Sequence, residues 1–393
     1  YTIFGGMKSV LYTSVLQTPI LLLGSLIILV LGFKELGGWD EMMRVCGAVT
    51  VNDYGDTMTN LIRSNDDANF PWLGALIGSA IIGFWYWCTD QFIVQRVLSG
   101  KNEMEARRGT IFGAYLKLLP VFLFLIPGMI AFALHQKYIG AGGEGFLPML
   151  ENGTANADAA FPTLVAKLLP AGVKGLVVCG ILAALMSSLA SLFNSSAMLF
   201  TIDFYKRFRP QTSEKKLVGI GQVATVVIVI LGILWIPIMR SVGDVLYTYL
   251  QDVQSVLAPG IAAAFLLGIC WKRTSAQGGM WGLISGMVIG LTRLGAKVYY
   301  SNAGEVADST FKYLFYDMNW LFFCGWMFLF CIIVVIVVSL ATEAPTAEKI
   351  QGLVFGTATK EQKASTRASW NHWDIIHTVI ILAITGAFYW YFW

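Results

Sequence analysis

Charged residues are scarce in this chain of 393 residues: aspartate, glutamate, lysine and arginine together make up 13% of it. This is roughly half of their share in an ordinary soluble domain. Hydrophobic residues make up 56%, and they gather in runs long enough to cross a lipid bilayer. These features exclude a soluble globule, a disordered segment and a coiled coil. The net charge of only +3, without a basic block interleaved with aromatic residues, also predicts no nucleic-acid partner.

Residues that carry enzyme chemistry are few. The six cysteines and three histidines show no spacing typical of a metal site, and no motif of a nucleophile with its base is present. We therefore expect a protein that is not an enzyme and that binds no organic cofactor.

The apolar runs predict an all-α membrane protein. Each run is close to the ~20 residues that ~30 Å of hydrocarbon requires. Nine spanning helices are predicted, near residues 9 to 33, 71 to 94, 108 to 135, 171 to 202, 216 to 239, 245 to 270, 277 to 300, 318 to 341 and 373 to 393.

The loops between these runs alternate in charge. Lysine and arginine gather after the second, fourth, sixth and eighth runs, whereas residues 34 to 70 are rich in acidic residues and residues 136 to 160 hold one lysine. Basic loops of membrane proteins stay in the cytoplasm. The pattern predicts a multi-pass protein of the cell membrane with Tyr1 inside and Trp393 outside.

Lys117 is predicted to lie roughly 14 Å below the inner surface, near the middle of the bilayer. A lysine at this depth marks a functional site by default. Pro120 follows one turn later and invites a kink, because its ring nitrogen cannot donate a hydrogen bond. The alternative is a lysine that only holds helices together through a paired carboxylate or carbonyl.

An aromatic segment, residues 85 to 91 (WYWCTDQ), lies roughly 20 Å below the outer surface in this topology. Tyr86 and Trp87 offer flat faces on which a sugar ring can pack and polar ends that can bind its hydroxyls. Packing between helices explains the rings equally well. The neighbouring Asp90 and Gln91 favour a binding site or a break in the helix.

The fourth run carries a stripe of small residues, many with hydroxyls. It consists of Ala184, Ser187, Ser188, Ser191 and Ser195, which recur at helical spacing. Serine hydroxyls beside freed backbone carbonyls are typical ligands of sodium. The pattern alone, however, fits close packing between helices better.

The sixth run begins with an unusually polar segment, residues 247 to 255 (YTYLQDVQS). Thr248, Gln251 and Ser255 share one face of the predicted helix, which must face protein or water. An amide network between helices is an open alternative. The four polar places lie at similar depths on different helices, as in the mid-membrane sites of secondary transporters.

These residues resemble the sodium/solute symporter family, and specifically its sodium/glucose cotransporter branch. The resemblance runs through nearly the whole chain. It is strongest in residues 85 to 91, 115 to 120 (YLKLLP) and 186 to 189 (MSSL), with weaker matches to family signatures in residues 1 to 9 and 272 to 279.

The resemblance implies roles for particular residues. Tyr86 would be the inner gate under the sugar ring, and Trp87, Lys117 and Gln251 would complete the sugar pocket. Gly83 stands where relatives often have Asn or Thr, so one sugar hydrogen bond is expected to be missing. The sodium ligands implied are the carbonyl of Ala184 and the hydroxyls of Ser187 and Ser188.

Two departures concern the number of sodium ions. Ser14 stands where the family usually has Asp, and Ala190 stands where members with a second sodium site have Thr. We therefore expect one sodium per sugar.

The resemblance also implies an inverted-repeat, LeuT-like fold, of whose fourteen helices this chain holds nine. Residues 1 to 70 would form the fifth core helix and an outer loop, residues 71 to 270 the second five-helix repeat, and residues 271 to 393 three closing helices. The chain would then need the preceding helices of the same protein as partners.

The expected function is sodium-coupled uptake of a glucose-like or galactose-like hexose by alternating access. Sodium, the sugar and the lipid bilayer are the expected partners, with sodium as the coupling ion. Two alternatives stay open: symport of myo-inositol, another polyol or a non-sugar solute, and a sodium or sugar sensor that does not transport.

Overall fold

The computed structural model describes residues 2–150, 153–240, 246–302 and 307–392. The described part is helical, with a few isolated bridges in its loops and no extended strand. The chain folds as two compact units, one made of residues 1–59 and 113–239 and the other of residues 60–112 and 240–393. The predicted all-α class is confirmed. The predicted division at residues 70 and 270 concerns sequence repeats and stays a prediction.

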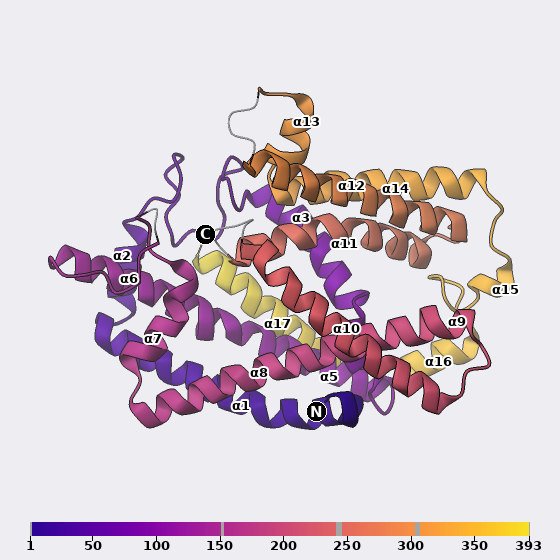
Figure 1. Cartoon of the computed structure of the whole chain (residues 1–393), viewed down its shortest axis with the longest axis horizontal. Helices are drawn as coiled ribbons and strands as arrows, with labels where there is room; N and C mark the ends of the chain where they lie inside the picture. The colour runs from indigo at the N-terminus through magenta and orange to yellow at the C-terminus, as the bar shows by residue number, and fades with distance from the viewer. Residues whose placement is uncertain (1, 151–152, 241–245, 303–306, 393) are drawn as a thin grey trace. The chain divides into compact units, whose positions relative to one another are not determined.

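The first unit is built around two long helices, α1 and α8, which run side by side (Figure 1). Val177 of α8 packs against Gly24 of α1, and Ile20 packs against Gly180. Its helices are α1 (Thr2–Leu36), α2 (Trp39–Gly47), the end of α5 (Glu103–Pro120), η1 (Val121–Leu125), α6 (Ile126–Gly140), η2 (Ala157–Ala159), α7 (Ala160–Leu168), α8 (Ala171–Met198), η3 (Leu199–Tyr205), α9 (Lys206–Phe208) and α10 (Glu214–Arg240).

The second unit is built around α3, α11, α12 and α14, of which α11, α12 and α14 pack along one another. Its core contains Ile81, Ala258, Leu321 and Cys324. The helices are α3 (Trp72–Cys88), α4 (Gln91–Leu98), the start of α5, α11 (Leu246–Cys270), α12 (Ala276–Asn302), α13 (Thr310–Lys312), η4 (Tyr313–Asp317), α14 (Trp320–Ala341), α15 (Ala347–Ile350), α16 (Lys360–Ala368) and α17 (His372–Tyr391).

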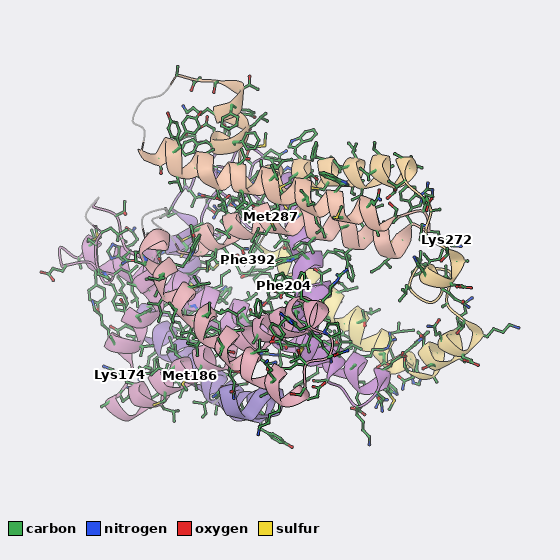
Figure 2. The ribbon with its side chains drawn as sticks, turned by 45° about the vertical axis from the view of Figure 1, so that its right-hand side comes forward. Lys174, Met186, Phe204, Lys272, Met287 and Phe392 are labelled. Carbon is green, nitrogen blue, oxygen red and sulfur yellow. The ribbon has the colours of Figure 1, made fainter. Side chains whose placement is uncertain are left out.

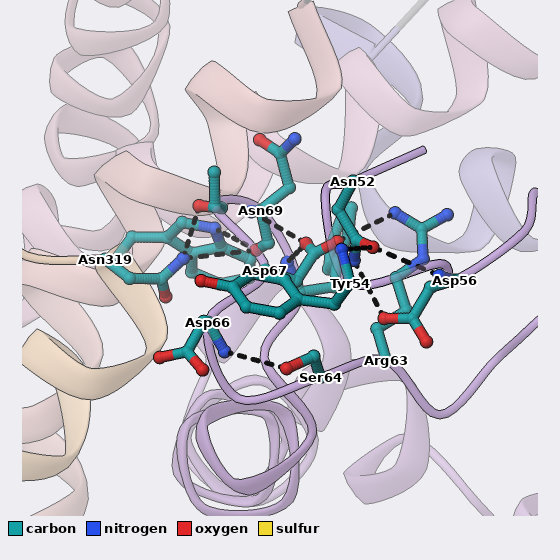
Figure 3. Close-up of polar contacts among 12 residues, drawn as sticks. Asn52, Tyr54, Asp56, Arg63, Ser64, Asp66, Asp67, Asn69 and Asn319 are labelled. Carbon is teal, nitrogen blue, oxygen red and sulfur yellow. Dashed lines mark hydrogen bonds and ion pairs between the residues drawn. The ribbon is translucent and has the colours of Figure 1, made fainter. Parts of the chain in front are cut away.

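The loop before α3 is fastened to the start of α14 inside the second unit (Figure 3). Asn319, the N-cap of α14, donates its side-chain amide to the carbonyl of Ala68 at 2.7 Å. Trp320 donates its indole N–H to the carbonyl of Asn69 at 3.2 Å. The Asp67 carboxylate accepts from two backbone amides of the loop and pairs with Arg63. These contacts fix where α3 begins.

Within the described residues, seven helical segments are long and apolar enough to cross a membrane, or eight if the bent pair α3–α4 is one span. They coincide with eight of the nine predicted stretches. The ninth is a helix, α12, whose 27 residues include Arg293 and Lys297 and which lies outside the apolar set. The structure supports a multi-pass membrane protein, and the count of nine spans stays a prediction.

Large apolar side chains are exposed along several of these helices. Met186 on α8 and Met287 on α12, labelled in Figure 2, are more than half exposed. A lipid bilayer is the solvent in which such surfaces are stable. Tyr1 and Trp393, which the basic loops predict to lie inside and outside, are not among the described residues.

Candidate functional site

The aromatic segment ends at a sharp break between two helices. The axes of α3 and α4 differ by 48° across this break. The Thr89 hydroxyl donates to the carbonyl of Trp85 at 2.7 Å, and the Asp90 carboxylate accepts from the amide of Phe92 at 3.0 Å. Asp90 is thus the N-cap of α4, and capping lets a new helix start in a new direction. The predicted break in this helix is confirmed.

The three rings of this segment have different surroundings. Trp85 packs against the core of the second unit, which is the packing role that the sequence left open. Tyr86 is half-buried, and Trp87 is 49% exposed. The centroids of the Tyr86 and Trp87 rings lie 5.3 Å apart, edge to face. Trp87 therefore presents exposed aromatic surface, whereas Trp85 packs into the core.

Gly83 lies one turn before the rings, and no atom lies within 4 Å of the place that a Cβ would take. A larger side chain would fit there. The glycine therefore leaves open space at the place where the resemblance implies that a sugar hydrogen bond is missing.

Gln251 lies on α11, which packs directly against α3. Phe84 of α3 and Phe265 of α11 are in ring contact with centroids 6.3 Å apart. The Gln251 amide is half-buried and donates to the Tyr247 hydroxyl at 3.3 Å. The structure thus places Gly83, Tyr86, Trp87 and Gln251 on two neighbouring helices of the second unit.

Lys117 lies in the first unit, in the last turn of α5, and its side chain is exposed. Directly after Pro120 the backbone changes to a π-helical turn, Val121–Leu125. The irregularity expected beside Lys117 is therefore present, because proline cannot continue the regular hydrogen-bond ladder.

The sodium candidates lie on α8, also in the first unit. Ser187 is buried, together with Ser191 and Ser195, whereas Ala184 is half-buried and Ser188 is exposed. Successive residues of a helix differ by 100° in direction, so Ser187 and Ser188 point to different surroundings. The predicted stripe is divided between a buried row and an exposed hydroxyl.

A cavity of about 700 Å³ is present in the first unit, and none of the candidate residues above lines it. It is lined by residues 144 to 149, 162, 163, 166 and 167, in and beside a predicted outer loop. Lys167 donates to the carbonyl of Phe146 at 2.7 Å and lies over its ring. The ammonium therefore braces the wall of the cavity.

A buried ion cluster in the second unit was missed by the sequence interpretation. Asp252 on α11 pairs with Arg293 and Lys297 on α12. The signal was available, since a carboxylate and two cations inside predicted membrane spans are functional candidates. Nothing in a single sequence shows, however, that these helices are neighbours.

Comparison with known proteins identifies the class and then the family. The helices and the polar residues within them define a multi-pass membrane protein. Residues 1–286 match the model of the sodium:solute symporter family. The chain belongs to this family, whose relatives are transporters and not enzymes, and sodium is the coupling ion that the family implies.

Three relatives illustrate the match. A sodium/mannose cotransporter from Bos taurus is 35% identical over all of this chain and 69% of its own length. A sodium/myo-inositol cotransporter 2 from Homo sapiens is 36% identical over 91% of this chain and 54% of its own length. A sodium/glucose cotransporter 1 from Ovis aries is 38% identical over 87% of this chain and 54% of its own length. The chain thus spans between 54% and 69% of the length of these relatives.

Proposed function

We propose that this chain forms part of a symporter that couples sodium entry to uptake of a glucose-like or galactose-like hexose by alternating access. The observation that carries the proposal is the family match over residues 1–286, together with relatives named for sodium-coupled transport of mannose and glucose. The aromatic rings beside a helix break, next to a helix that carries Gln251, fit a solute of this chemistry.

The residue roles follow from this proposal. Tyr86 would close under the sugar ring, and Trp87, Lys117 and Gln251 would bind sugar hydroxyls, with open space above Gly83. The carbonyl of Ala184 and the hydroxyls of Ser187 and Ser188 would bind sodium. Ser187 is buried and Ser188 is exposed, so we infer that the ion binds where the buried face of α8 meets its exposed face.

Coupling needs no covalent chemistry. Sodium bound on α8 would stabilise the outward-facing state, and sugar affinity would rise by the same factor by which sugar raises sodium affinity. We further propose one sodium per sugar, because Ser14 and Ala190 replace the expected second set of ligands; the Ser14 side chain lies outside those that the structure describes.

The proposed architecture is the inverted-repeat, LeuT-like fold with nine spans in this chain, α12 being the ninth. The proposed location is the plasma membrane with the C-terminus outside. Basic residues in every second loop support this orientation.

Symport of myo-inositol is the second candidate. It is favoured by relatives named sodium/myo-inositol cotransporter 2, which match as well as those named for glucose and mannose. Choice among ring polyols depends on a few hydroxyl contacts, each worth a large factor in selectivity.

Uptake by the full-length protein in liposomes tests both candidates. Radiolabelled glucose, mannose and myo-inositol are offered with an inward sodium gradient, and then with choline in place of sodium. We expect sodium-dependent accumulation of a hexose. Accumulation of myo-inositol alone would select the second candidate, and binding without accumulation of any of the three would contradict transport.

A further inference from the structure

Asp252, Arg293 and Lys297 form a buried cluster with no assigned role in the proposed sites. The Asp252 carboxylate accepts from Lys297 Nζ at 2.5 Å, and its other oxygen faces Arg293 Nη2 at 3.7 Å. The Arg293 side chain is fully buried and that of Asp252 is 12% exposed. Charges are costly to bury and are retained where they fix a particular arrangement or serve a function.

Arg293 is itself held in place by several contacts. Its guanidinium donates to the carbonyl of Leu314 at 3.3 Å and to that of Met318 at 2.7 Å. It also lies over the ring of Phe323 on α14, 4.1 Å from the centroid. The positive partner of Asp252 is therefore anchored to two further segments of the second unit and cannot easily follow a movement of α11.

The backbones of α11 and α12 approach closely just below this cluster. A Cβ on Gly286 would lie 2.9 Å from the Cα of Gly260, and one on Gly290 would lie 2.5 Å from the carbonyl oxygen of Val256. From the Gly260–Gly286 contact to the Val256–Gly290 contact, the position on α11 moves by one turn toward Asp252. The ion pairs of Asp252 with Arg293 and Lys297 lie about one turn further along the same two helices. They resist rotation of α11 about its axis.

Gln251 directly precedes Asp252 in α11, so contacts that fix the direction of the Asp252 side chain also fix the direction in which the Gln251 side chain points from the helix. We propose that Asp252, held by Lys297 and Arg293, is a positioning residue that aims the Gln251 amide at one hydroxyl of the solute. The proposal rests on the proposed function of Gln251 as a solute ligand. A hydrogen bond that selects one hydroxyl depends steeply on such aim.

The test compares solutes that lack single hydroxyls. In the full-length protein, we first measure sodium-driven uptake of the transported sugar and of its deoxy analogues, each of which lacks one hydroxyl. The hydroxyl bound by Gln251 is the one whose removal lowers uptake by the wild type but not by Gln251→Ala. Asp252→Asn is expected to lose discrimination at this same hydroxyl. Its KM for the sugar should rise about tenfold or more, with maximal rate and sodium KM changed by less than about threefold.

A double variant separates positioning from general damage. Asp252→Asn leaves two buried cations without their carboxylate, and Lys297→Met removes one of them. The pair Asp252→Asn/Lys297→Met should therefore recover part of the discrimination that Asp252→Asn loses, since coupled buried charges are not additive. Should Asp252→Asn fail to reach the membrane, Lys297→Met alone gives the readout, with reduced discrimination expected.

Asp308→Asn is the matched control, because it breaks an exposed pair with Lys312 in the same unit and should leave discrimination intact. If Asp252→Asn discriminates between the solutes as the wild type does, the inference is overturned, but the proposed role of Gln251 as a ligand stands. The same holds for Lys297→Met where it replaces Asp252→Asn in the test. An unaltered hydroxyl preference in Gln251→Ala instead overturns the proposed role of Gln251 and the inference with it.

Discussion

At the residue scale, Lys117 is the strongest candidate for a charged solute ligand. Removal of its ammonium by Lys117→Ala should weaken sugar binding about tenfold or more, because a hydrogen bond from a charged donor is worth about 1.5–3 kcal/mol. Sodium binding should weaken less, since the ion is proposed to lie on α8. Isothermal titration of the full-length protein with each ligand measures both affinities. Lys216→Ala, on the exposed start of α10, is the control, and unchanged sugar affinity in Lys117→Ala would count against the assignment.

Alanine substitution of Ser187 and of Ser191 distinguishes a sodium ligand from a serine that serves only helix packing. Both are buried on α8, one turn apart, so either alanine variant removes a buried hydroxyl. Ser187→Ala is expected to raise the sodium concentration for half-maximal uptake about tenfold, whereas Ser191→Ala should change it little. Equal effects of the two substitutions would show that the buried row serves packing.

Cys46 on α2 provides a test of burial and of the protonation state that burial favours. Burial raises the pKa of this thiol from 9.0 to about 11. The folded state therefore favours the neutral thiol, and the stability that this contributes is complete below pH 9 and is lost as the pH rises toward 11. Maleimide should label exposed Cys270 at pH 7.5 but reach Cys46 only after denaturation, as mass spectrometry can show. Rapid labelling of Cys46 in the native protein would refute the burial.

At the element scale, the contact between α11 and α12 depends on the absence of side chains. Gly290→Ala should lower the free energy of unfolding by about 1–3 kcal/mol, because its Cβ would press on the carbonyl of Val256 in a packed core. Thermal unfolding of the purified protein in detergent measures the change. Gly279→Ala, on the same helix with no atom within 4 Å of the new Cβ, is the control. A melting temperature equally unchanged in both variants would contradict the close contact.

The elements themselves follow from local sequence, whereas their neighbours do not. Apolar runs predicted the helices, and Asp90 with Gln91 indicated a break after the aromatic segment. Ser187 and Ser188 looked equivalent because helical spacing alone does not say which face is covered. The role of Arg293 and Lys297 likewise became evident only from the position of α12 beside Asp252. The periodicity of one helix does not predict which distant helix packs against it.

At the scale of the whole molecule, the ratio of sodium to sugar can be measured electrically. With one sodium per neutral sugar, a tenfold change in the sugar gradient should shift the reversal potential by about 59 mV, and with two sodium ions by about half as much. Currents from the full-length protein in voltage-clamped cells give this value. A shift near the smaller figure would contradict the single sodium ion inferred from Ser14 and Ala190.

The bend between α3 and α4 has a consequence for how readily a solute is received. The Thr89 hydroxyl and the Asp90 carboxylate bind a carbonyl and an amide at this break, so residues of the chain itself hold the bend. A solute that bound beside Tyr86 and Trp87 as proposed would therefore meet rings already set at their angle, and none of its binding free energy would be consumed in unwinding a helix.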